Sequence, residues 1–126
     1  MPRTLRLVLV APGALAFVLS SPVTAQGVSF YRQQLTSAVR ELDKITMEIN
    51  SLQDQLHGVT SREQGCRLLK SKIYELQRGQ LQAEKVAGYA AQLGEDELHR
   101  AAVDQHNAFL ENRKLSEQDA ARNSCG

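Results

Sequence analysis

This sequence lacks a marked excess of charge of either sign. Its 126 residues carry 15 lysines and arginines against 14 aspartates and glutamates, which gives a net charge of +1 at pH 7. Proteins that bind nucleic acid normally show a clear basic excess. The near-neutral balance therefore excludes nucleic acid as the expected partner.

The motifs of familiar catalytic and metal sites are also missing. There is no G-x-S-x-G, no glycine-rich phosphate loop, no H-E-x-x-H and no C-x-x-C. His57 stands alone, and the spacing of His99 and His106 would hold their rings about 10 Å apart on one helix, too far for a shared metal ion. We expect no catalytic, cofactor-binding or metal-binding residue, and the sequence favours a binding or structural role over an enzymatic one.

No apolar run is long enough to span a membrane, although the chain begins with apolar residues. Arginines precede an apolar run from Leu7 to Leu19, and small residues follow as far as Ala25. Because a spanning helix needs about 20 residues, this layout indicates a cleaved signal peptide, residues 1–25. We expect a mature domain of residues 26–126 that has no membrane span and is periplasmic or secreted.

With no strand pattern in the chain, apolar periodicity predicts the fold. The first helix is predicted over about 29–57, and Gly58 is its expected stop. Apolar residues recur there in steps of three and four, the pattern of a heptad seam. The seam consists of Leu35, Ala38, Leu42, Ile45, Ile49, Leu52 and Leu56.

A second helix is predicted over about 61–93, antiparallel to the first because the turn between them is short. Thr60 to Glu63 fits the S/T-x-x-E capping box. The same rhythm continues at Cys66, Leu69, Ile73, Leu76, Gln80, Ala83, Ala87 and Ala90. Small residues dominate the second half, where Gly79 and Gly88 lower helix propensity, so we expect that half to be the softer one.

A third helix is predicted over about 95–115, with acidic residues in its first turn. Its stripe is poorer and consists of Leu98, Ala102, Gln105 and Phe109. Ser116 and Asp119 are expected to cap a short final turn in a fraying tail, residues 116–126. The fold class is all-α, an antiparallel hairpin with heptad packing plus a third helix, in sum a small three-helix bundle.

Charge is divided unevenly between the last two helices. The second has an excess of basic residues and the third an excess of acidic ones. We expect the two sets to neutralise each other inside the bundle.

The two cysteines should meet at one end of the bundle. In an up-down-up path, Cys66 near the start of the second helix and Cys125 at the end of the third lie at similar heights. Export to an oxidising compartment favours a disulfide between them. An intermolecular disulfide and free thiols remain alternatives.

The strong seam of the first helix faces two weaker stripes, which suggests incomplete cover. We therefore predict self-association or a protein partner along the seam near Leu35, Leu42 and Ile45. The expected function is that of a small exported binding or structural protein of the cell envelope, acting through helix–helix contacts. The alternatives are a periplasmic chaperone-like adaptor, or an all-α ligand carrier or enzyme with a pocket between helices.

Overall fold

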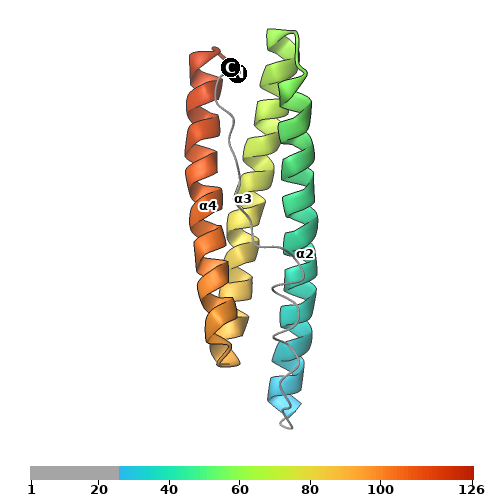
Figure 1. Ribbon diagram of the computed structural model, residues 1–126, viewed down its shortest axis with the longest axis vertical. Coiled ribbons are helices and arrows are strands. Elements are labelled where there is room, and N and C mark those ends of the chain that lie inside the picture. The colour runs from blue at the N-terminus through green and yellow to red at the C-terminus, as the bar shows by residue number, and fades with distance from the viewer. Residues whose placement is uncertain (1–25) are drawn as a thin grey trace.

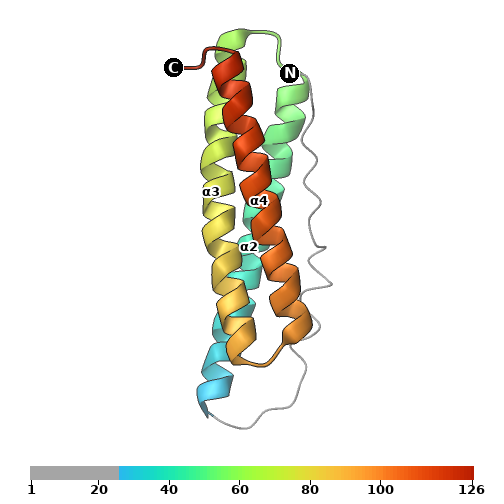
Figure 2. The same cartoon turned by 90° about the vertical axis from the view of Figure 1, so that its left-hand side faces the viewer.

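The computed structural model describes residues 26–126, which form three helices lying side by side (Figure 1). They are α2 (Gln26–His57), α3 (Arg62–Gln92) and α4 (Asp96–Arg122). Short turns reverse the chain twice, so the path is up-down-up (Figure 2). The predicted all-α three-helix bundle is confirmed. The predicted signal peptide, residues 1–25, lies outside the described residues.

The N-cap of α3 lies one residue later in the chain than the sequence predicts. Ser61, and not Thr60, is the N-cap, and its hydroxyl accepts a hydrogen bond from the backbone N–H of Gln64 at 3.1 Å. A hydroxyl in this position satisfies one of the free amides of the first helical turn. Ser61 to Gln64 fits the related capping pattern Ser-x-x-Gln, which begins one residue after the predicted capping box.

The turn between α3 and α4 is formed by Gly94, whose φ is +71°. The N–H of Glu95 bonds to the carbonyl of Ala90 at 2.9 Å, and that of Gly94 bonds to Ala91 at 3.2 Å. This pair of bonds is the Schellman motif, in which a left-handed residue ends a helix. Glycine adopts that conformation at no steric cost, so the chain reverses here.

The last helix is longer than expected, because α4 continues to Arg122 and residues 116–122 are helical. Ser116 and Asp119 do not cap a final turn; both are buried within the helix. The helix ends in a second Schellman motif, with Ser124 at φ 56° and the N–H of Cys125 bonded to Ala120 at 2.9 Å. Residues 123–126 therefore leave the helix in a defined turn.

α3 is the middle helix, and α2 and α4 each pack along it. The seam of α2 is buried as predicted, together with Val39. One continuous apolar cluster fills the half of the bundle near the α3–α4 turn. Its buried members are Leu35, Ala38, Val39, Leu42, Ile45, Ile49, Leu76, Ala83, Val86, Ala90, Leu98, Ala102 and Phe109.

The buried row of α3 differs in part from the predicted one. Leu69, Leu76, Ala83 and Ala90 are buried as expected. The second row, spaced by seven, is Gly65, Lys72, Gly79 and Val86, whereas Cys66, Ile73, Gln80 and Ala87 are only half-buried. A helix between two neighbours buries a wider arc than one stripe, so glycines and a lysine occupy positions that an apolar pattern does not identify.

Candidate functional site

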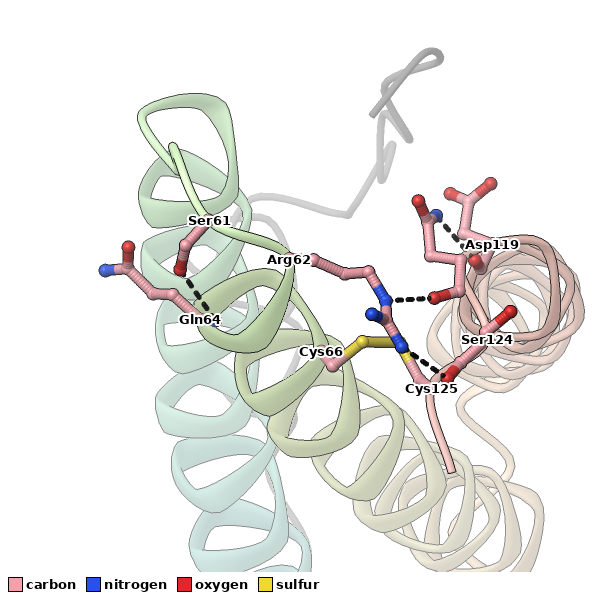
Figure 3. The surroundings of a disulfide bond; sticks show 8 residues. Ser61, Arg62, Gln64, Cys66, Asp119, Ser124 and Cys125 are labelled. Carbon is pink, nitrogen blue, oxygen red and sulfur yellow. Dashed lines mark hydrogen bonds between the residues drawn. A yellow bond between two sulfur atoms is a disulfide. The ribbon is translucent and has the colours of Figure 1, made fainter.

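A disulfide joins Cys66, in the first turns of α3, to Cys125, just after α4, with their Cα atoms 5.4 Å apart (Figure 3). The turn at Ser124 brings Cys125 back towards α3. The structure therefore pairs the two cysteines within one chain, at the end of the bundle opposite the α3–α4 turn.

Arg62 makes a second connection beside the disulfide. Its Nε donates to the carbonyl of Asn123 at 2.8 Å, and its Nη2 donates to that of Ser124 at 3.3 Å, as Figure 3 shows. Carbonyls at the end of a helix have no partner within it. The guanidinium therefore holds the exit from α4 against the start of α3.

Beneath the disulfide, polar side chains are buried along with Leu69. Lys72 is only 1% exposed, and its Nζ donates to Oε1 of Gln53 on α2. Burial lowers the pKa of Lys72 to about 8, and the nearby charge of Asp119 opposes that shift. Asp119 is 7% exposed and accepts from Arg122 at 2.8 Å.

The α4 residues that face this region are Asn112, Ser116 and Asp119, all buried. Asn112 donates to the carbonyl of Ala108 at 2.9 Å. A buried amine can serve as a nucleophile when its pKa is lowered, but it must be accessible to a substrate. Lys72 is enclosed, so we interpret this polar cluster as structural.

The hollows of the structure lie on its surface. One of about 370 Å³ adjoins the disulfide and is lined by Arg62, Glu63, Cys66, Arg67, Lys70 and residues 124–126. A larger one of about 680 Å³ lies between α2 and α3 and is lined by Glu41, Ile45, Arg78, Leu81, Gln82, Glu84 and Lys85. Both have charged walls, unlike the mostly apolar pocket typical of a small-molecule carrier.

The residues predicted to bind a partner do not lie on the surface. Leu35 and Leu42 are 0% exposed and Ile45 is 2% exposed. They belong to one buried cluster with small residues of α3, such as Ala83 and Ala90, and with Leu98 and Phe109 of α4. The side chains of Leu35 and Leu42 are therefore enclosed in the bundle, and Ile45 borders a surface hollow with almost none of its own area exposed.

An apolar and basic stripe does lie on the surface, along the outer side of α3. Tyr74 is 59% exposed and Leu81 is 63% exposed, and they are two helical turns apart. Arg67, Lys70 and Lys85 continue the same line in steps of three and four, and all are exposed. We call these five residues the α3 face.

The expected charge neutralisation between α3 and α4 does not involve the α3 face. Within residues 26–126, a ring nitrogen of His106 on α4 lies 3.1 Å from a carboxylate oxygen of Glu84 on α3. This contact is an ion pair only when His106 is protonated, and its acid comes from the basic helix. Arg78 pairs with Glu75 at 2.7 Å and with Glu41 of α2 at 3.0 Å. No ion pair engages Arg67, Lys70 or Lys85 among the described residues.

The histidines make polar contacts with neighbouring helical residues. A ring nitrogen of His99 lies 3.0 Å from the carbonyl of Ala87, and one of His57 lies 3.3 Å from the amide nitrogen of Gln53. In the described part of the chain, no three His, Cys, Asp or Glu side chains group as a metal site would require. Nor does any helix there combine the length and apolar character needed to cross a membrane.

No family model, curated protein or solved structure matches this chain. Sequence reasoning missed the α3 face because it searched for buried seams. The signal that could have found it is the recurrence of Arg67, Lys70, Tyr74, Leu81 and Lys85 on the polar side of a predicted amphipathic helix.

Proposed function

We propose that this protein is a small exported helical module of the cell envelope that acts by binding another protein. The observation that carries the proposal is the α3 face, where two large apolar side chains are exposed among cations that form no ion pair within residues 26–126. Exposed apolar groups rimmed by polar ones are typical of interaction sites. The closed core and the charged, open hollows favour such a role over that of a ligand carrier or an enzyme.

Export is the other half of the proposal, and two features support it. The first residues have the layout of a signal peptide. The Cys66–Cys125 disulfide would persist in an oxidising compartment and would be reduced in a bacterial cytosol. Fractionation of the native host tests this half, since recovery of the protein in the cytosol with residues 1–25 attached would refute export.

Site-specific crosslinking in the host tests the binding role. A photoreactive amino acid replaces Tyr74 or Leu81 in one set of strains, and Met47 in the control. Met47 is 68% exposed on the outer side of α2, so it matches the test positions in exposure. We expect a discrete crosslinked protein from the α3 positions and none from Met47. Equal labelling at all three positions, or none at all, would mean that the α3 face is not the contact surface.

A further inference from the structure

We infer that the α3 face binds an acidic amphipathic helix of a partner protein, an inference that rests on the proposed binding function and names the chemistry of its ligand. The face has the geometry of a helix-packing surface. Tyr74 and Leu81 are seven residues apart, which separates them by about 10 Å along the helix axis. That spacing matches one heptad of a second helix laid alongside α3.

The charges of the α3 face indicate the sign of the partner. Arg67 and Lys70 lie at one end of the apolar pair and Lys85 at the other. Glu84, the acid next to Lys85, already bonds to His106. Glu63 lies one turn before Arg67, beyond the end of the face. Between Arg67 and Leu81 the face has no acid of its own, so the partner must supply the negative charge.

A second copy of this chain is a poor partner for the same face. Antiparallel pairing of two α3 helices would match Tyr74 with Leu81 and would place Lys70 opposite Lys85. Parallel pairing would place each cation opposite itself. Like charges across a helix pair oppose association and direct helices towards other partners. Charge therefore disfavours self-pairing in both orientations and favours a heterologous acidic helix.

The surface around the face leaves room for such a helix. Arg67 and Lys70 line the hollow of about 370 Å³ beside the disulfide, together with Glu63. Leu81 and Lys85 line the one of about 680 Å³ between α2 and α3, together with Glu41 and Glu84. Side chains of a docked helix could enter both hollows while its apolar stripe covers Tyr74 and Leu81. This is the helix-in-groove mode of recognition, in which apolar anchor residues one heptad apart, here Tyr74 and Leu81, contact the bound helix.

A displayed library of helical peptides tests the inference. The peptides are about four heptads long, so that they form helices, and their contact positions vary among Leu, Ala, Glu and Lys. They are selected against the purified protein with its disulfide intact. We expect enrichment of Leu at heptad spacing flanked by Glu.

Matched variants show whether the selected peptides bind the α3 face. Leu81→Ser should weaken binding about tenfold or more, as loss of a central anchor does. Met47→Ser, an equally exposed change on α2, should leave it unchanged. The double variant Lys70→Glu/Lys85→Glu should select Lys-flanked peptides instead, whereas Lys44→Glu on α2 should still select Glu-flanked ones.

Several outcomes would overturn the inference. They are enrichment of basic or uncharged peptides, no enrichment at all, and binding that survives the α3 variants. Binding to vesicles of phosphatidylglycerol in phosphatidylcholine without binding to peptides would also overturn it, since the ligand would then be a lipid surface. If crosslinks from Tyr74 still capture a protein, the proposed function stands and only the acidic chemistry fails.

Discussion

The ring of Phe109 lies against the backbone of Gly79, so close that a Cβ on residue 79 would stand 3.0 Å from two ring carbons. Phe109 is fully buried in the apolar cluster and has little room to move. A glycine that looks like a weakness in the helix pattern thus makes room for the largest apolar side chain of the core.

Gly79→Ala should therefore destabilise the protein, by about 1 kcal/mol, because overpacking outweighs the gain in helix propensity. Gly88→Ala is the matched control, since nothing lies within 4 Å of a Cβ there. It should stabilise the fold by about 0.5–1 kcal/mol. Urea unfolding of both variants measures the difference. If Gly79→Ala stabilises as much as Gly88→Ala does, the close contact is not present in solution.

Ser124→Gly should stabilise the protein by about 0.5–1 kcal/mol. Ser124 has a φ of 56°, a left-handed conformation that costs a residue with a Cβ about 1–2 kcal/mol. Glycine removes that cost but loses part of the gain to its freer unfolded chain. The control is Ser71→Gly, in the exposed middle of α3, which should destabilise instead. Thermal melts that move in the same direction for both variants would contradict this reading of the turn.

Reduction of the disulfide should loosen the end of α4 before the rest of the bundle. The bond closes a loop with a sequence separation of 59, for which chain entropy gives about 4 kcal/mol of stabilisation. In the last turns of α4 the buried side chains are Asn112, Ser116 and Asp119, which supply little apolar burial. Hydrogen exchange should therefore accelerate most from Asn112 to Arg122 and least around Phe109.

The Cys66→Ser variant is the control for this experiment. It should reproduce the accelerated exchange of the reduced protein, and reductant should have no further effect on it. Uniform acceleration along all three helices would mean that the disulfide stabilises the bundle as one unit and does not act locally on α4.

Lys72 should make stability depend on pH in the alkaline range. Its pKa falls from 10.5 to about 8 on folding, so below pH 8 both states carry the proton and the full cost of burying the charge is present. As pH rises from 8 towards 10.5, the folded state releases the proton first and stability increases by up to about 3 kcal/mol. Urea unfolding across this range should show that rise.

The variant Lys72→Met separates this effect from other groups that titrate at high pH. It should lack the rise, so its free energy of unfolding relative to the natural chain should fall between pH 8 and 10.5. The neighbouring Asp119 keeps its bond to Arg122 in the variant. Parallel pH profiles for the two proteins would show that the amine is not desolvated by folding.

The sequence predicts the parts of the fold that depend on apolar periodicity. The α2 seam and the row of Leu69, Leu76, Ala83 and Ala90 are buried as expected, because heptad spacing directly reports a buried stripe. The meeting of Cys66 and Cys125 could be anticipated from helix lengths alone. These features involve local pattern and chain geometry, and they require no knowledge of which side chains touch.

The features that apolar periodicity did not predict depend on packing between helices. Lys72 looks like a surface residue, and it is buried because Gln53 of α2 and Asp119 of α4 surround its amine. The end of α4 looks like a tail because Ser116 and Asp119 are polar, yet both are buried in a helix. Leu35 was predicted to bind a partner because the sequence does not show that it is fully buried in the cluster shared by the three helices. Conversely, the sequence could not show that the α3 face is exposed, since its exposure depends on where α2 and α4 lie.

The disulfide also sets how the chain would carry a mechanical load. Tension applied between the start of α2 and Cys125 passes through the sulfur–sulfur bond directly to Cys66. All of α4 and most of α3 lie in the loop that this bond closes, so they are shielded from the force. α2 is outside the loop and is held only by non-covalent packing. Under load, α2 should peel away first while α3 and α4 remain paired.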